Sequence, residues 1–365
     1  MVDVYIYGAG DVGKRAYRLF TRLFPSDLKI IGFIDEYKSG NIFNLPIMRI
    51  DEVNDRRTLV IIAIEDRNTA RFVWNSLKRA LFSDIRYFVE KGSYLPSNIQ
   101  DFKSYCMDCS NWKYDGATIN GLEMHVVDYC NLNCKGCTHF SPIFPKVFPS
   151  YQERMAEIRN LAAKVEMIKL ISIMGGEPLL NPNLNEYVIQ LRKMLPFTRL
   201  FLITNGLLIP KIDRMLLRNI SLNGVKVIIS DYQPTHKIIR EICTILEEYH
   251  IEYEIRDTQK YFVIPLSLSQ NSKYTKGCIS DKCNMVWKGK IARCPTLMFI
   301  GEFNRHFSTA FPEDGVIDLS SRIAGWDLVN RLRERVPLCD YCVINKVSWQ
   351  KCGNVPQLSD FVVPD

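Results

Sequence analysis

The stretch GLEMHVVDYCNLNCKGC, residues 121–137, carries the strongest structural signal in the sequence. Its first half, Leu122–Asp128, is a short apolar run that predicts a buried β-strand. Its second half places Cys130, Cys134 and Cys137 in one tight loop directly after that strand. Three thiolates in such a loop can hold three irons of a 4Fe–4S cube and leave the fourth iron without a protein ligand.

The cysteines as a set favour metal chemistry over disulfides. The chain has 12 cysteines, none before Cys106, and most of the others lie in short-spaced groups. Disulfide frameworks are typical of small secreted domains, whereas this chain is long and shows no export signal. For the loop of residues 130–137, zinc is the alternative to iron, because His125 or His139 could supply the fourth ligand that structural zinc usually takes.

Size and composition limit the function classes. With 365 residues, 47% of them hydrophobic and 24% charged, the chain has an ordinary globular balance, and its length predicts two or three domains. Apolar stretches such as Ile168–Ile173 are much shorter than the roughly 20 residues of a membrane span. We expect no signal peptide and no membrane anchor, and hence a cytoplasmic protein. The net charge of +7 is spread along the chain, so we expect a small-molecule partner and no nucleic acid.

Apolar runs after the cysteine loop continue the pattern of a strand followed by a helix. The predicted strands are Leu122–Asp128, Lys169–Met174, Arg199–Thr204, Val225–Ser230 and Ile251–Arg256. Helical apolar periodicity fills the gaps between them. Five or six such units predict an α/β fold with a partial (β/α)5-6 parallel barrel, and function at the carboxyl ends of its strands.

The first hundred residues predict a separate parallel α/β unit, because strands alternate with helices there as well. Gly8, Gly10 and Gly13 form GxGxxG between the first strand and the first helix, and Asp35 ends the second strand. This is the dinucleotide-binding fingerprint of Rossmann-like domains in its proper context. The segments also resemble nucleotide-sugar-binding domains of sugar acyltransferases. A nucleotide or nucleotide sugar is the expected ligand; NAD and a scaffold without ligand are the alternatives.

The central part of the chain resembles the radical S-adenosylmethionine (radical SAM) superfamily. CNLNCKGC matches its CxxxCxxC loop, and MGGEP at 174–178 resembles its GGEP motif. ITNG at 203–206 and IISDY at 228–232 match motifs at its later strand ends. The resemblance covers residues 120–260 and implies a TIM-like partial barrel that binds S-adenosylmethionine and a 4Fe–4S cluster.

The resemblance also implies roles for individual residues. The cluster ligands would be Cys130, Cys134 and Cys137. Contacts with the methionine amino group would come from Gly175, Gly176 and Glu177, and contacts with the ribose or carboxylate from Asn205 and Ser230. Gly136 departs from the family pattern, in which an aromatic residue often precedes the third cysteine and packs on adenine. We expect His139 or Phe140 to take that place.

The last hundred residues contain a second group of cysteines after a hairpin predicted at Asn284–Arg293. Their spacing resembles the twitch module, a shortened SPASM module that holds one auxiliary 4Fe–4S cluster. The implied ligands are Cys278, Cys294, Cys339 and Cys342. Cys283 competes with Cys278 for the first position, and a structural zinc site is the alternative use of all of them.

Together these features predict a three-part enzyme. Its parts are a nucleotide-binding domain at 1–97, a linker at 98–119, the partial barrel at 120–262 and an auxiliary-cluster cap at 263–365. The resemblance implies hydrogen abstraction from a carbohydrate or nucleotide sugar, with electrons from a flavodoxin or ferredoxin. Dehydrogenation is the favoured outcome; epimerisation, with Cys283 or Cys352 as hydrogen donor, and dehydration are the others. Modification of a ribosomally made peptide and a zinc-stabilised nucleotide sensor are the rival functions.

Overall fold

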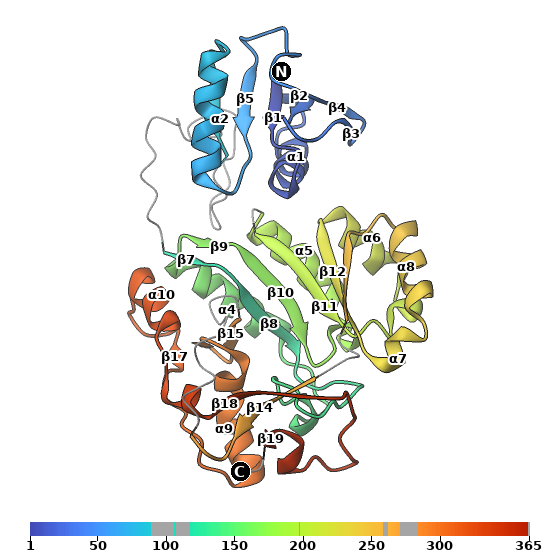
Figure 1. Ribbon diagram of the computed structural model, residues 1–365, viewed down its shortest axis with the longest axis vertical. Helices are drawn as coiled ribbons and strands as arrows, with labels where there is room; N and C mark the ends of the chain where they lie inside the picture. The colour runs from blue at the N-terminus through green and yellow to red at the C-terminus, as the bar shows by residue number, and fades with distance from the viewer. Residues whose placement is uncertain (89–105, 107–116, 197, 258–261, 271–282, 364–365) are drawn as a thin grey trace. The chain divides into compact units, whose positions relative to one another are not determined.

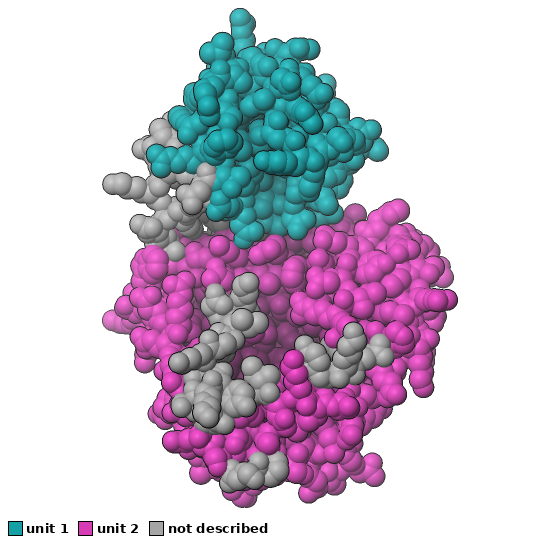
Figure 2. Space-filling model, in the orientation of Figure 1, with its two compact units in different colours: residues 1–115 teal, residues 116–365 magenta. Residues whose placement is uncertain are grey.

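The computed structural model describes residues 1–88, 106, 117–196, 198–257, 262–270 and 283–363 (Figure 1). The chain forms two compact units, Met1–Asp115 and Gly116–Asp365, each of which is described by itself (Figure 2). Among the described residues, no helix has both the length and the apolar composition needed to cross a membrane.

In its described residues, the first unit is a six-stranded sheet with two helices. In spatial order its strands are β3 (Gly40–Ile42), β4 (Leu45–Met48), β2 (Leu28–Ile34), β1 (Val2–Tyr7), β5 (Leu59–Ile62) and β6 (Ile85–Tyr87). The helices are α1 (Asp11–Leu23) and α2 (Arg67–Arg79). All neighbouring strands run parallel except the β3–β4 hairpin, which the sequence did not predict. The expected alternation of strands with helices is confirmed, since α1 follows β1 and α2 lies between β5 and β6 along the chain.

Burial explains why these segments form strands and helices. Every residue of β5 is buried, as its unbroken apolar run predicts for a strand covered on both faces. Helix α1 buries Ala16, Leu19 and Phe20, which lie on one face at helical spacing. The Asp66 side chain caps α2 by accepting a hydrogen bond from the Thr69 backbone N–H at 2.7 Å.

The second unit is built on an eight-stranded sheet. Its strands in spatial order are β13 (Tyr253–Asp257), β12 (Val225–Asp231), β11 (Arg199–Thr204), β10 (Leu170–Gly175), β8 (Leu122–Val127), β15 (Asn284–Trp287), β16 (Lys290–Ala292) and β17 (Ile317–Asp318). The strands from β13 to β15 pair in parallel. The five predicted strands are thus confirmed, with ends that differ by one or two residues.

Helices between these strands cover the sheet and complete its core. They are α4 (Tyr151–Lys164), α5 (Leu184–Met194), α6 (Arg214–Leu222) and α8 (Ile239–Glu248), with a short α7 (Gln233–His236) (Figure 1). Ile158 of α4, Tyr187 of α5 and Ile242 of α8 are fully buried in one hydrophobic cluster with residues of all the central strands. The result is a mixed α/β unit whose parallel strands all present their carboxyl ends on one side.

The C-terminal region continues the second unit. The predicted hairpin is confirmed as β15 and β16, and β15 extends the central sheet by pairing in parallel with β8. A second sheet has the order β18 (Cys342–Val347), β14 (Phe262–Ser267), β19 (Val362–Val363). Helices α9 (Pro295–Phe307) and α10 (Gly325–Arg333) complete the region. Contacts within the unit do not divide it at the expected boundary of 262/263.

The predicted linker of residues 98–119 lies mostly outside the described residues. At its end, β7 (Thr118–Ile119) pairs in parallel with β9 (Met167–Ile168), just before the central strands begin.

Candidate functional site

A cavity of about 360 Å³ lies at the carboxyl ends of β8, β10, β11 and β12. This is the end of a parallel barrel at which active sites are found. Its lining includes seven of the residues predicted from the sequence: Cys130, Cys134, Cys137, Gly175, Gly176, Asn205 and Ser230. Segments up to a hundred residues apart in the chain therefore meet in one place.

The loop that carries the three cysteines is tied to the next strand ends. The Asn205 side chain, at the end of β11, donates from Nδ2 to Asn131 Oδ1 at 2.7 Å. The Asn205 Oδ1 accepts from the Leu207 backbone N–H at 3.1 Å, which orients the amide. Within the loop, the Leu132 N–H donates to Cys130 Sγ at 3.4 Å. The loop is thus held in shape by the protein's own hydrogen bonds.

The glycine pair at the end of β10 is required by close backbone packing. A Cβ on Gly175 would lie 1.9 Å from the Val127 carbonyl oxygen, and one on Gly176 would lie 2.0 Å from that of Tyr129. Any side chain at either position would push the cysteine loop away from β10. The pair therefore keeps the loop at the cavity.

Glu177 lies beside the cavity but is not part of its lining. Its carboxylate is fully buried and accepts three hydrogen bonds, from Thr204 Oγ1 at 2.6 Å, the Asn205 N–H at 2.8 Å and the Leu179 N–H at 3.0 Å. Burial raises the pKa of Glu177 to about 7, although the hydrogen bonds oppose that shift. In this structure Glu177 joins the end of β10 to the end of β11, and its contact with a methionine amino group stays a prediction.

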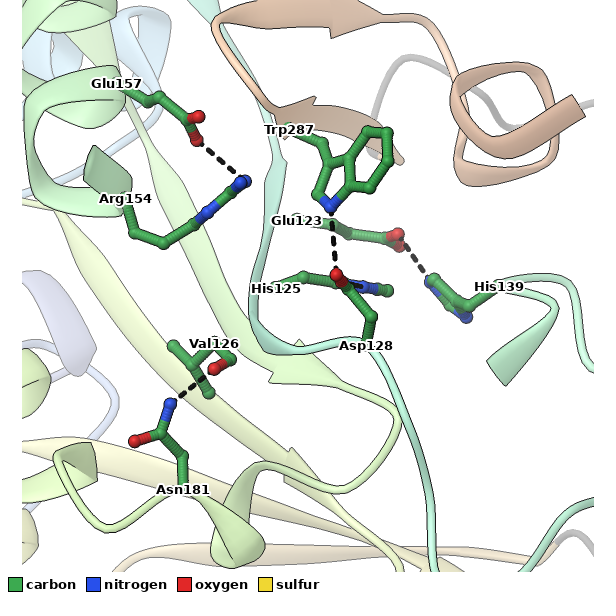
Figure 3. Close-up of polar contacts among 9 residues, drawn as sticks. All are labelled: Glu123, His125, Val126, Asp128, His139, Arg154, Glu157, Asn181 and Trp287. Carbon is green, nitrogen blue, oxygen red and sulfur yellow. Dashed lines mark hydrogen bonds and ion pairs between the residues drawn. The ribbon is translucent and has the colours of Figure 1, made fainter. Parts of the chain in front are cut away.

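A Glu123–His139 pair is the main feature of the site that sequence reasoning missed (Figure 3). The His139 Nε2 lies 3.0 Å from Glu123 Oε2, and both residues line the cavity. Burial alone would lower the pKa of His139, but hydrogen bonds with Cys137 and Glu123 outweigh it and raise the pKa to about 10. A charged imidazolium therefore lies next to one of the three cysteines. Glu123 faces the cavity only because β8 alternates its side chains, and no spacing rule pairs it with His139.

A second histidine, His125, belongs to the framework and not to the cavity lining. Its Nδ1 lies 3.0 Å from Asp128 Oδ1, and the Trp287 indole N–H donates to Asp128 Oδ2 at 3.1 Å (Figure 3). The contact fastens β8 to β15. Both histidines proposed as zinc ligands are thus bonded to carboxylates.

Two further contacts in Figure 3 hold the flanking elements. The buried Arg154 and Glu157 of α4 pair at 2.9 Å, and the other Glu157 oxygen accepts from the Gly289 N–H at 2.8 Å. The Asn181 side chain donates to the Val126 carbonyl, which fixes the segment after β10 to β8.

The aromatic residue expected in place of Gly136 is not Phe140. Phe140 is fully buried in the C-terminal core, with its ring 4.5 Å from that of Phe303. Gly136 itself has φ of +68°, and a Cβ there would lie 2.5 Å from the Val263 carbonyl oxygen of β14. Tyr232, which follows β12 and ends the IISDY motif, lines the cavity, and so does Phe262 at the start of β14, which had no signal in the sequence. The cavity also contains Arg256 of β13.

The C-terminal cysteines lie in several elements of the second unit. Cys278 lies outside the described residues. Cys294 caps α9, with its Sγ accepting from the Leu297 N–H at 3.4 Å. Cys339 lies in the short helix η6 (Pro337–Tyr341), and Cys342 begins β18. Their joint role as cluster ligands stays a prediction.

The two cysteines proposed as hydrogen donors do not line the cavity. Cys283 directly precedes β15. The Cys352 N–H donates to the Asn133 carbonyl at 2.8 Å, and its side chain is part of the C-terminal hydrophobic core.

In the first unit, the glycine loop and Asp35 are brought together as predicted. Gly8, Gly10 and Gly13 lie between β1 and α1. The Ala9 N–H donates to Asp35 Oδ2 at 2.8 Å, and Asp35 Oδ1 accepts backbone hydrogen bonds from the two residues at 37 and 38. Both carboxylate oxygens thus hold the loop in place, and binding of a nucleotide there stays a prediction.

The three cavity cysteines suit an iron–sulfur cluster by the chemistry of their donor set. Thiolates are the ligands of 4Fe–4S clusters, and three of them leave one iron open. Burial is the main reason that the pKa of Cys130 is raised to about 12 in the metal-free chain. Ligation must therefore release protons, as for other thiolate sites.

Comparison with known proteins finds matches for the part of the chain that carries this site. Residues 124–250 match the Radical SAM superfamily model. The chain is 29% identical over 126 residues to GTP 3',8-cyclase of Petrotoga mobilis, covering 34% of this chain and 39% of the relative. It is 30% identical over 148 residues to GTP 3',8-cyclase of Clostridium acetobutylicum, covering 36% and 45%. The chain thus spans less than half the length of these curated relatives.

Solved structures also match parts of the chain. BtrN in complex with AdoMet and 2-DOIA has 14% identity and a TM-score of 0.40, covering 61% of this chain and 92% of BtrN. Native anSMEcpe with bound AdoMet and Kp18Cys peptide has 19% identity and a TM-score of 0.31, covering 38% and 42%. The match of residues 124–250 to the Radical SAM model implies S-adenosylmethionine and a 4Fe–4S cluster as cofactors, and the three cysteines that line the cavity suit such a cluster.

Proposed function

We propose that this protein removes a hydrogen atom from a C–H bond of a carbohydrate or nucleotide-linked sugar, with oxidation of an alcohol to a ketone as the outcome. One observation carries the proposal: the three cysteines, the glycine pair, Asn205 and Ser230 line a single cavity at the strand ends. When bound, the cluster and S-adenosylmethionine supply a carbon radical able to break a C–H bond.

The residues of the chain bind and orient the reactants. Cys130, Cys134 and Cys137 hold the cluster, and the backbone at 175–176 lies against the methionine moiety. Asn205 and Ser230 have polar groups suited to the ribose or the carboxylate.

Arg256 and the aromatic lining add further selectivity. The Arg256 Nε lies 3.3 Å from Glu254 Oε1, which leaves its terminal N–H groups for an anion such as a carboxylate or phosphate. Tyr232 and Phe262 offer flat surfaces for a base or a sugar ring.

Oxidation of an alcohol requires acceptors for one proton and one electron after the hydrogen atom has left. The Glu123 carboxylate, which pairs with His139 in the cavity lining, would take up the proton. The electron would pass to an auxiliary cluster held by Cys278, Cys294, Cys339 and Cys342. An external reductant such as flavodoxin or ferredoxin would supply the electron that starts each cycle.

A nucleotide is the second candidate substrate, because both curated relatives are named GTP 3',8-cyclase. Cyclisation leaves the oxidation state of the substrate unchanged, so it would not need the C-terminal cysteines as an electron acceptor. The glycine loop of the first unit, with Asp35, would by itself suit binding of a nucleotide.

The experiment that tests the proposal follows deuterium from substrate to cofactor. Reconstituted protein is incubated with S-adenosylmethionine, reductant and ring-deuterated nucleotide sugars, and 5'-deoxyadenosine is examined by mass spectrometry. We expect deuterium in 5'-deoxyadenosine and a product two hydrogens lighter. Deuterium from ribose-labelled GTP alone would favour the cyclase, and deuterium from a peptide alone would favour peptide modification. A variant with alanine at all three cavity cysteines is the blank.

A further inference from the structure

The C-terminal segment of residues 349–360, here called the C-terminal strap, packs directly on the loop that carries the cluster cysteines. Lys351 forms an isolated antiparallel bridge with Cys134. The Lys135 N–H donates to the Gln350 carbonyl at 2.9 Å, and the Cys352 N–H donates to the Asn133 carbonyl at 2.8 Å. More than two hundred residues of sequence separate the two segments.

The far end of the strap holds the same loop from a second point. The Gly136 N–H donates to the Asp360 carbonyl at 2.7 Å, and Lys135 Nζ lies 3.2 Å from the buried Asp360 Oδ1. The loop is thus bonded to the strap at four consecutive residues, 133–136. Such a set of backbone contacts places the strap's side chains next to the cysteines reproducibly.

One strap side chain reaches a cysteine sulfur. The half-buried Trp349 has its indole Nε1 3.1 Å from Cys134 Sγ. An indole N–H can only donate a hydrogen bond, so the sulfur is the acceptor. The ring of Trp349 also lies 6.0 Å from that of Tyr232, which lines the cavity. The contact therefore lies at the side of the loop where the cavity and the strap meet.

We propose that Trp349 is a positioning residue for the cluster, whose indole N–H donates to the Cys134 thiolate and raises the reduction potential of the cluster. The inference rests on the part of the proposed function that assigns Cys134 as a ligand. It does not depend on the identity of the substrate.

The direction of the effect follows from charge. A reduced cluster carries one more electron, and part of that charge lies on its cysteine sulfurs. A hydrogen bond to such a sulfur stabilises the reduced form more than the oxidised form, and hydrogen bonds to the sulfurs are among the factors that set cluster potentials. The C-terminal strap would thereby make it easier for an external reductant to start the reaction.

The first test detects the contact between the indole and the cluster directly. The protein is produced with 15N-labelled indole in its five tryptophans, reconstituted anaerobically, reduced and examined by pulsed EPR. We expect a 15N coupling to the reduced cluster that is lost in Trp349→Phe and kept in Trp326→Phe. Trp326 lies on α10 and is 47% exposed, which makes it a matched control. Absence of any 15N coupling in the unsubstituted protein would overturn the inference.

The second test measures the potential itself in an EPR-monitored redox titration. Phe at 349 keeps an aromatic ring but removes the N–H, so we expect a more negative potential. At a fixed solution potential, the ratio of reduced to oxidised cluster would fall about fivefold, which corresponds to about 1 kcal/mol, the net contribution of one typical hydrogen bond. An unchanged potential at full iron content would contradict the inference. Failure of every carbohydrate to transfer hydrogen would overturn the proposed substrate and leave this result standing.

Discussion

At the scale of single residues, the glycine that precedes the third cysteine shows how local geometry overrides a family pattern. Gly136 has a positive φ, and the backbone of β14 lies so close to it that an added Cβ would clash. Gly289, in the turn of the β15–β16 hairpin, has nearly the same φ of +73°, but a Cβ added there would meet nothing within 4 Å. A comparison of the two glycines therefore distinguishes the cost of a positive φ from the cost of a steric clash.

Alanine at these two glycines should therefore have unequal effects. Gly289→Ala should lower the free energy of unfolding by about 1 kcal/mol, the cost of a left-handed conformation for an L-residue. Gly136→Ala should cost more and reduce iron content, because the Cβ would push the cysteine loop from β14. Urea unfolding of the metal-free proteins and iron assay after reconstitution measure both effects. If both variants lose the same free energy of unfolding and both keep their full iron content, this account is contradicted.

His139 provides a prediction about pH. Its pKa of about 10 in the folded metal-free chain exceeds the value of about 6.5 expected when unfolded. Its contribution to stability is therefore complete below pH 6.5 and disappears as the pH rises toward 10. Histidine NMR of the metal-free protein should show one of the five imidazoles charged through pH 8. Glu123→Gln should lower that pKa; titration of all five near pH 6.5 in the unsubstituted protein would show that the pair does not form.

The sequence predicted the residues that belong to short motifs and missed those that reach the cavity from elsewhere. The cysteines and Asn205 follow strands in recognisable strings, so their meeting at one edge follows from the parallel order. Glu123, Arg256 and Trp349 have no such string. Their places depend on side-chain alternation along β8 and β13 and on the return of the C-terminal strap.

At the scale of elements, α4 carries a buried charge pair, one member of which also bonds to the β15–β16 hairpin. Arg154 is 3% exposed and Glu157 7% exposed, and Glu157 also accepts the Gly289 N–H. The contact fixes the hairpin, and through it β15, beside β8.

Removing one member of this pair should be costly. Glu157→Ala leaves Arg154 buried without its carboxylate and should lower the free energy of unfolding by about 3 kcal/mol. The double variant Arg154→Met, Glu157→Met should recover most of that loss, because it leaves no uncompensated charge. Urea unfolding of the second unit measures both. If the double variant is as unstable as the single one, lost packing and not the unpaired charge causes most of the loss in the free energy of unfolding.

Apolar runs predicted most of the central strands, but not all of their partners. Strands β8, β10, β11 and β12 have mainly apolar segments typical of a buried sheet, whereas β13 carries charged residues and is mostly exposed. The parallel pairing of β15 with β8 joins segments about 160 residues apart and carries no local signal. The short β3–β4 hairpin is too brief and too exposed for alternation to identify it.

At the scale of the whole molecule, each compact unit has its own hydrophobic core. Residues such as Ile62 and Leu77 form the core of the first unit, and the cluster site lies wholly in the second. A ligand that binds one folded unit stabilises that unit by mass action.

Loading the cluster should thus shift only one unfolding transition. In anaerobic calorimetry we expect the transition of the second unit to move to higher temperature on reconstitution, and that of the first to stay unchanged. Chelation of the iron should reverse the shift. Equal movement of both transitions would show that the units unfold together.

The most direct test of the central claim is the iron content and S-adenosylmethionine cleavage of the anaerobically reconstituted chain. We predict 5'-deoxyadenosine in the presence of dithionite and about eight irons per chain, two 4Fe–4S cubes. Alanine at Cys130, Cys134 and Cys137 should abolish the product and leave about four irons. Zinc without iron, no 5'-deoxyadenosine, or cleavage that survives the loss of these three cysteines would contradict the account.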